Sequence, residues 1–152
     1  MNLDISQLNN HLKMKKAIII YQSKKGTTKK FGEEIGAFLS QNNVGSKVKS
    51  VQDFNPDDMA TADYVFLGCW TNGMFLMFQH PDKAWAKFAE KLPALDNKKM
   101  ALFTTYKIAT GVMFKAMKKH IKTSDHLPEL KSRNGGLSEQ NKTDLLRIIQ
   151  VI

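Results

Sequence analysis

Runs of apolar residues alternate with segments of helical spacing from residue 15 to the end of the chain. Lys16–Tyr21 is a short β-branched run without polar alternation, and Tyr64–Trp70 and Lys99–Thr105 are also rich in apolar residues. Such runs are typical of strands that are covered on both faces. Val44–Phe54 alternates and is polar, which predicts an edge strand, and Leu127–Ser132 is the candidate for a fifth strand.

Four apolar stripes at helical spacing predict helices between and after these strands. They comprise Phe31, Ile35, Phe38 and Leu39; Trp85, Phe88, Ala89 and Leu92; Met113, Ala116, Met117 and Ile121; and Leu145, Ile148, Ile149 and Ile152. We expect Pro81 in the first turn of the second helix, Gly111 at the start of the third, and Ser138 as the cap of the last. Whether Pro56–Ala62 forms a helix is left open, because the segment is short.

The alternation of strands and helices predicts one three-layer α/β domain with a parallel sheet over residues 15–152. Residues 1–14 are expected to form a tail or a short, weakly docked helix, because Ile5, Leu8 and Leu12 have helical spacing. No apolar run approaches the roughly 20 residues that cross a bilayer, and no signal peptide is recognised. The single cysteine, Cys69, excludes an internal disulfide and favours a cytoplasmic location.

The chain is strongly basic, with a net charge of +9 and a pI near 9.6. Such a surface attracts anions such as nucleic acid, an acidic protein, an anionic membrane or a phosphorylated ligand. The basic residues are scattered and lack an interleaved aromatic pattern, which argues against nucleic acid. The histidines lack ligand spacing with carboxylates, so we expect no metal site.

Candidate chemistry lies in the loops after the strands, because open parallel sheets bind ligands beyond the carboxyl ends of their strands. Gln22–Thr28 leaves a buried strand, enters a helix, and combines hydroxyls with one glycine. Such a loop wraps a phosphate with backbone N–H groups, hydroxyls and the positive end of a helix dipole, and Lys24 and Lys25 add charge. It has neither a Walker A nor a Gly-x-Gly-x-x-Gly pattern, and a capped turn that binds nothing is the alternative. Lys131–Gly136 is expected to be a flexible exit from the last strand, with anion binding as the alternative.

The chain resembles flavodoxins at three places that follow in the family's order. The family's phosphate loop reads Ser/Thr-x-Thr-Gly-x-Thr, and Ser23–Thr28 matches its first, fourth and sixth positions. Lys25 replaces the middle threonine and offers a charge-assisted contact instead. Asp63–Gly73 resembles the third strand and first flavin loop of short flavodoxins, and Lys98–Tyr106 resembles the fourth strand and second flavin loop. The resemblance covers roughly residues 15–150.

This resemblance implies a flavodoxin-like three-layer α/β/α sandwich with a five-stranded parallel sheet in the order 2-1-3-4-5, which binds FMN non-covalently. The implied phosphate contacts are Ser23, Lys24, Lys25, Gly26, Thr27 and Thr28; Trp70, Thr71, Asn72 and Gly73 would lie on one side of the isoalloxazine ring, and Thr104, Thr105, Tyr106 and Lys107 on the other side or at its edge. Trp70 and Tyr106 suit stacking on a flat ring, with ordinary packing as the alternative. A positive charge such as Lys107 near the ring raises the potential.

The resulting hypothesis is an FMN-binding protein that shuttles electrons between a reductase and an acceptor, without catalytic residues of its own. Alternatives are an FMN-dependent oxidoreductase acting on a planar substrate such as a quinone, and a non-redox domain binding another phosphate ligand. The charge of +9 departs from the acidic surface usual in the family, so we expect redox partners with acidic docking surfaces. The apolar run Met74–Phe78 is a second departure: it packs in the core, lines the flavin site, or forms a partner or dimer surface. We expect a monomer or weak dimer. A redox role for Cys69 is the alternative to simple burial.

Overall fold

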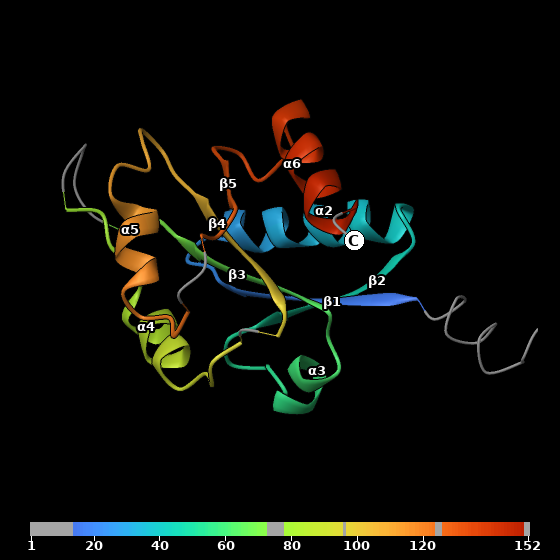
Figure 1. Cartoon of the computed structure of the whole chain (residues 1–152). Coiled ribbons are helices and arrows are strands. Elements are labelled where there is room, and N and C mark those ends of the chain that lie inside the picture. Colours follow the sequence, from blue (N-terminus) through green and yellow to red (C-terminus); the bar gives the residue numbers. More distant parts are fainter. Residues whose placement is uncertain (1–13, 73–77, 96, 124–125, 151–152) are drawn as a thin grey trace, which may run out of the picture.

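Five parallel strands form a single sheet in the order β2-β1-β3-β4-β5, as predicted (Figure 1). The computed structural model describes residues 14–72, 78–95, 97–123 and 126–150. The strands are β1 (Lys15–Gln22), β2 (Val44–Ser50), β3 (Tyr64–Trp70), β4 (Lys99–Thr105) and β5 (Glu129–Ser132). The expectations for residues 1–13, for Gly73 and for Met74–Met77 concern positions outside the described residues.

Helices cover both faces of the sheet and make the predicted three layers (Figure 1). The helices are α2 (Thr27–Gln41), α3 (Pro56–Ala60), α4 (Lys83–Glu90), α5 (Met113–Lys118) and α6 (Glu139–Gln150). The apolar sides of α2 and α6 pack on one face through residues such as Phe31 and Leu145. The other three helices pack on the opposite face, where Met59, Trp85 and Met117 are buried. No helix within the described ranges is long and apolar enough to cross a bilayer.

Strand β1 shows why the apolar runs form the middle of the sheet. Ile18 and Ile20 face the layer that holds α3, α4 and α5, whereas Ile19 faces the α2 and α6 layer. All three side chains are essentially inaccessible to solvent, because successive strand residues point to opposite faces and both faces are covered. Burial of three such side chains contributes roughly 1.5–3 kcal/mol each, which explains the absence of polar alternation.

Gly68 on β3 makes room for an aromatic ring on the neighbouring strand. It pairs in register with Phe103 on β4, and a Cβ atom at position 68 would overlap the Phe103 ring. That ring in turn meets Phe31 of α2 edge to face, with centroids 5.8 Å apart. Any larger residue at position 68 would push the ring out of the contact through which α2 packs on the centre of the sheet.

The predicted element ends are wrong where polar turn residues interrupt an apolar pattern. Strand β2 ends at Ser50 instead of Phe54, because Asp53 N donates to Ser50 O at 3.1 Å and turns the chain. Helix α4 begins at Lys83 and not at Pro81, because the Asp82 side chain accepts from Ala84 N at 2.8 Å and caps the helix. Capping groups of this kind set where a helix starts.

The ends of the remaining elements were predicted with mixed success. Helix α5 spans only Met113–Lys118, so Ile121 of the predicted stripe lies beyond it, although its side chain is still buried. Strand β5 begins at Glu129, two residues later than predicted. The predicted cap of α6 is confirmed, since Asn141 N donates to Ser138 Oγ at 3.0 Å. Pro56–Ala62 contains the short helix α3.

Candidate functional site

The loops after β1, β3 and β4 meet in one cavity of about 320 Å³ beyond the carboxyl ends of the strands. Parallel pairing of β1 with β3 and of β3 with β4 brings the three loops to the same edge of the sheet. Every predicted site residue lines the cavity except Gly26, Thr104 and Gly73, and Gly73 lies outside the described residues. Three lining residues, Ile108, Ala109 and Arg133, were not predicted as site residues.

The loop after β1 lines the cavity and leads into a helix whose first turn has no side-chain cap. Gly26 is the N-cap of α2 with φ +96°, a left-handed conformation that glycine adopts without strain. Its own N–H donates to Ser23 Oγ at 3.0 Å, and no side chain caps the first turn of the helix. The first amides of a helix need acceptors, and they carry the positive end of its dipole. With Lys24 and Lys25 also lining the cavity, this end fits a phosphate group.

Hydroxyl groups tie the three loops together beneath the cavity. Thr28 Oγ1 and Thr105 Oγ1 lie 2.6 Å apart, which joins the first loop to the end of β4, and both side chains are buried. Thr104 donates to Cys69 O at 2.6 Å, and its oxygen lies 2.9 Å from Thr71 Oγ1. Since a hydroxyl has one proton, Thr71 is the donor of that second bond. Thr104 is fully buried, so it supports the cavity from below and does not line it.

Trp70 forms an aromatic wall whose position is set by Asp82. The indole Nε1 donates to Asp82 Oδ2 at 3.1 Å, and Gln22 Nε2 approaches the same oxygen at 3.4 Å. The ammonium of Lys24 lies 4.9 Å from the centroid of the Trp70 ring, a cation–π contact. Asp82 was missed as a supporting residue, although an acidic residue directly before an apolar helical stripe is a recognised capping signal.

Hydrogen bonds fix the two ends of the loop after β3 and link this loop to the start of α5. Asn72 and His80 form an antiparallel bridge, with N–H···O distances of 3.1 and 2.8 Å, so both ends of the loop are fixed. Gln79 is buried, and its Oε1 accepts from Val112 N at 3.3 Å, which links this loop to the start of α5. Phe78, the last residue of the apolar run Met74–Phe78, is 77% exposed and has φ +63°, so its side chain does not follow the core-packing alternative; Met74–Met77 lie outside the described residues.

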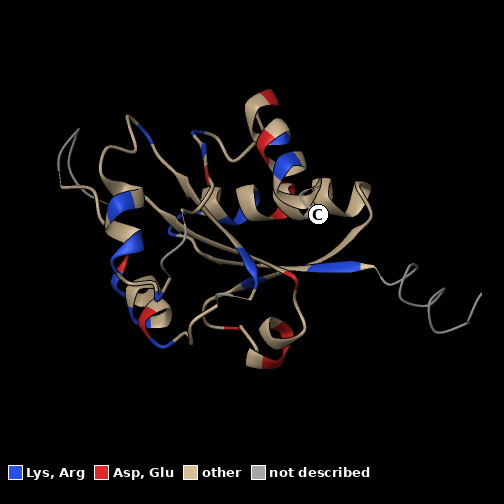
Figure 2. Cartoon of the chain, viewed as in Figure 1, with Lys and Arg blue, Asp and Glu red and all other residues tan. Residues whose placement is uncertain are grey.

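The cavity is positively charged. Four cationic side chains line it, from Lys24, Lys25, Lys107 and Arg133, and no aspartate or glutamate is among the lining residues. Basic residues occur on most elements and do not form one stripe (Figure 2). None of the four cations at the cavity forms an ion pair with a residue of the described ranges. Four uncompensated cations favour an anionic ligand.

Cys69 lies directly under the cavity but is not available for redox chemistry as a thiolate. Its side chain is fully buried, and its Sγ accepts from Asp82 N at 3.3 Å. Burial raises the pKa of the Cys69 thiol to about 12, because desolvation penalises the charged form. The thiol therefore stays protonated at neutral pH, as expected of a small buried residue.

The arrangement can be compared with known proteins. The flavodoxin-domain family model matches residues 18–144. A flavodoxin from Megasphaera elsdenii is 32% identical over 102 residues, which cover 66% of this chain and 72% of that protein. Two solved structures have the same fold. A short-chain flavodoxin associated with a non-canonical PDU bacterial microcompartment has a TM-score of 0.66 at 14% identity, covering 89% of this chain and 94% of that one. Oxidised flavodoxin 1 from Bacillus cereus has a TM-score of 0.62 at 16% identity, covering 90% and 99%. The chain therefore belongs to the flavodoxin family of FMN-containing electron-transfer proteins.

Proposed function

We propose that this chain carries electrons between a reductase and an acceptor, with FMN held in the cavity beyond the carboxyl ends of β1, β3 and β4. The observation that carries the proposal is the combination, in one cavity, of an uncapped helix N-terminus with lysines at one side and an aromatic wall at the other. FMN has a phosphate for the first and a flat ring for the second. Family membership supports the same cofactor.

The phosphate end is assigned to the loop that precedes α2. Backbone N–H groups of the first turn, the hydroxyls of Ser23, Thr27 and Thr28, and the ammonium groups of Lys24 and Lys25 supply donors on several sides. Gly26 contributes through its backbone conformation, because a side chain at φ +96° is strained even though space is available for it. Of the hydroxyls, Thr28 already shares a hydrogen bond with Thr105, whereas no acceptor within the described residues takes up the protons of Ser23 and Thr27.

The ring end is assigned to Trp70 and Tyr106, with the polar residues between them at the edge of the ring. Both aromatic side chains are half-buried and line the cavity. A half-buried aromatic wall gives a flat ligand a large contact at low entropic cost. The Lys24 ammonium over the Trp70 ring moves to the phosphate if the flavin uses that same face. When bound, FMN supplies the electron chemistry, and the protein orients it and sets its electrostatic surroundings.

The partner proteins are inferred to present acidic surfaces. No carboxylate lines the cavity, and Lys107 and Arg133 are exposed at it beside Ile108, which is 60% exposed. A partner with carboxylates around an apolar centre complements this rim and gains association rate from the attraction. The single, buried cysteine agrees with a cytoplasmic location for such an exchange.

A second candidate function is FMN-dependent reduction of a planar apolar substrate such as a quinone. It is favoured by the exposed apolar side chains of Ile108, Phe78 and Val112, which are 60%, 77% and 49% exposed. Ile108 lines the cavity itself. Membership of the flavodoxin family argues against the third alternative, a non-redox domain that binds another phosphate ligand.

The decisive experiment is a visible absorption spectrum of the purified protein, followed by titration of the cofactor-free protein with FMN and with riboflavin. We expect a flavin spectrum, saturation at one FMN per chain, and weaker binding of riboflavin because it lacks the phosphate. A colourless protein that takes up neither flavin would contradict the proposal. Steady-state assays with NAD(P)H and a quinone then separate the two candidates: turnover without an added reductase favours the enzyme, and turnover only with a reductase favours the carrier.

A further inference from the structure

The turn after β5 brings an arginine to the cavity from outside the three predicted loops. Arg133 lines the cavity, and its guanidinium donates to Lys107 O through Nε at 3.2 Å and Nη2 at 2.9 Å. Tyr106 N also donates to Ser132 O at 3.2 Å. The turn after β5 and the loop after β4 are therefore joined by both backbone and side-chain hydrogen bonds.

This turn is a built structure and not the flexible exit that the sequence predicted. Ser132 Oγ accepts from Gly135 N at 3.0 Å and donates to Gly136 O at 2.8 Å. Asn134 Oδ1 accepts from Gly136 N at 2.8 Å. Gly135 has φ +86°, and a Cβ atom there would come within 2.9 Å of Thr27 O. The turn thus packs against the first turn of α2, next to the proposed phosphate site.

Arg133 keeps unused hydrogen-bonding capacity. A guanidinium has five N–H donors in a fixed fork, and the Lys107 carbonyl engages only two of its nitrogens. Within the described ranges no carboxylate pairs with Arg133. The chain has 23 basic residues but only two arginines, Arg133 and Arg147. Arg147 lies at the other edge of the sheet, where it is paired with Asp144 at 3.9 Å.

We propose that Arg133 is a further cofactor-binding residue, which donates hydrogen bonds to the phosphate of FMN while its attachment to Lys107 O holds the loop after β4. The inference rests on the proposed function. The phosphate is chosen over the flavin ring because the turn that carries Arg133 packs on Thr27, in the phosphate loop. Guanidinium groups match phosphate oxygens in geometry as well as charge, which lysine does not.

The test compares FMN with riboflavin in the full-length protein, using quenching of flavin fluorescence to measure both dissociation constants. Arg133→Ala is expected to weaken FMN binding about tenfold, a moderate loss because the guanidinium is exposed and solvent screens it. Riboflavin binding should change less than twofold. Arg133→Lys should give an intermediate loss for FMN, since it keeps the charge and loses the fork. Arg147→Ala is the matched control, expected to leave both constants unchanged.

Each result decides a separate question. Equal losses for FMN and riboflavin in Arg133→Ala would mean that Arg133 only holds the loop, and the phosphate contact would be refuted. Unchanged FMN affinity would refute it as well. If Arg133→Ala does not fold, as judged by its thermal unfolding, Arg133→Gln replaces it, because glutamine keeps a donor for Lys107 O without the charge. A wild-type protein that binds no FMN would refute the proposed function itself, independently of Arg133.

Discussion

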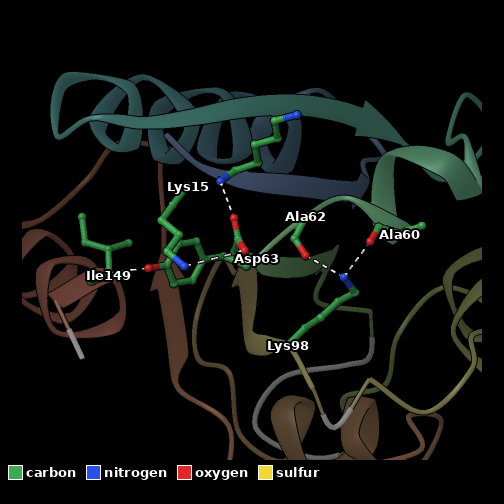
Figure 3. A network of polar contacts seen from close by, with 8 residues as sticks. Lys15, Ala60, Ala62, Asp63, Lys98 and Ile149 are labelled. Atoms are coloured by element: carbon green, nitrogen blue, oxygen red, sulfur yellow. Dashed lines mark hydrogen bonds and ion pairs between the residues drawn. The ribbon is translucent and has the colours of Figure 1, made fainter. Parts of the chain in front are cut away.

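Lysines at the two edges of the sheet have opposite kinds of surroundings. At the amino edge, Lys98 Nζ donates to Ala62 O at 2.6 Å and to Ala60 O at 3.1 Å (Figure 3). Lys15 Nζ lies 4.0 Å from Asp63 Oδ1, and the other oxygen of that carboxylate accepts from Lys16 N at 2.9 Å. These cations find acceptors inside the protein, and they hold the starts of β1, β3 and β4 together.

At the carboxyl edge the lysines have no such acceptors. Lys25 and Lys107 line the cavity, and their ammonium groups form no ion pair or hydrogen bond with residues of the described ranges. The Lys24 ammonium lies over the face of Trp70. Like charges gathered without compensation cost folding energy, so we expect an anion bound at the carboxyl edge to stabilise the protein. Amino-edge lysines such as Lys98 therefore support the fold, whereas carboxyl-edge lysines such as Lys25 are left free for the proposed ligand.

The largest expected effect is a charge reversal at the carboxyl edge. Lys25→Glu places a carboxylate against the cofactor phosphate and removes a charge-assisted hydrogen bond, so FMN affinity should fall about 100-fold, equivalent to about 2.7 kcal/mol. Titration by flavin fluorescence measures it. Lys49→Glu makes the same change on the exposed edge strand β2 and should leave affinity nearly unchanged. Equal losses in the two variants would show that only overall charge matters.

At the amino edge we expect a smaller effect, on the stability of the protein and not on its FMN affinity. Lys98→Met removes both hydrogen bonds to the carbonyls of Ala60 and Ala62, and the free energy of unfolding should fall by about 1 kcal/mol. Urea denaturation of the cofactor-free protein measures this, and FMN affinity should not change. The matched variant Lys25→Met should lose FMN affinity while keeping its stability. An equal loss of stability in Lys98→Met and Lys25→Met would contradict the proposed difference between the two edges.

Strand β3 carries one titrating group near each edge, which allows a pH test. Burial raises the pKa of Tyr64 above 10.0, with Asp63 adding to the shift, and raises the pKa of Cys69 from 9.0 to about 12. The unfolded chain therefore loses these protons first, and stability falls as pH rises above 9. For Cys69 the loss at pH 9.5 is less than about 1 kcal/mol. Cys69→Ala should reduce the decline of the unfolding free energy between pH 8.5 and 10, as measured by urea midpoints. An unchanged decline would show that groups other than Cys69 cause it.

The smallest effect concerns the potential of the bound flavin. Lys107→Gln removes a cation that lines the cavity, so the negative charge gained on reduction is less stabilised and the midpoint potential should become more negative by about 10–20 mV. Spectroelectrochemical titration measures the shift. Lys49→Gln, at an exposed position of β2 that is not among the lining residues, serves as the control. No shift, or a shift to a more positive potential, would remove Lys107 from the surroundings of the ring.

The strands of the sheet were predictable to the residue where the pattern is strongest. Tyr64–Trp70 and Lys99–Thr105 were predicted with their observed bounds, because strands covered on both faces have uninterrupted apolar runs. Strand β2 was predicted too long, because Val51 and Phe54 continue the alternation after the chain has turned at Ser50. Both side chains still pack against the core, so burial without strand pairing produced the misleading pattern.

The sequence predicted the part of the candidate site that lies in loops directly after the parallel strands. Loops that follow parallel strands lie at one edge, so residues such as Lys25 and Tyr106 were expected together and do line one cavity. Arg133 was missed because its segment contains two glycines and an asparagine and was interpreted as flexible. Hydrogen bonds of Ser132 with Gly135 and Gly136 order this turn, and so does its packing on Thr27, a residue more than 100 positions away that the local sequence does not reveal.

The amino-acid sequence by itself determined the layers, the strand order implied by its family resemblance, and the edge of the sheet at which the cofactor is proposed to bind. Periodic burial is local, and chain direction in a parallel sheet decides which loops share an edge. Only the tertiary structure decided which basic residues are free to meet a ligand. Lys98 directly precedes β4 and Lys25 follows β1, and each has a second lysine as its neighbour in the sequence. Two carbonyl groups from the segment before β3 accept hydrogen bonds from the ammonium of Lys98, whereas Lys25 lines a cavity. These acceptors lie more than 30 residues away in the sequence, so only the folded chain brings them to Lys98.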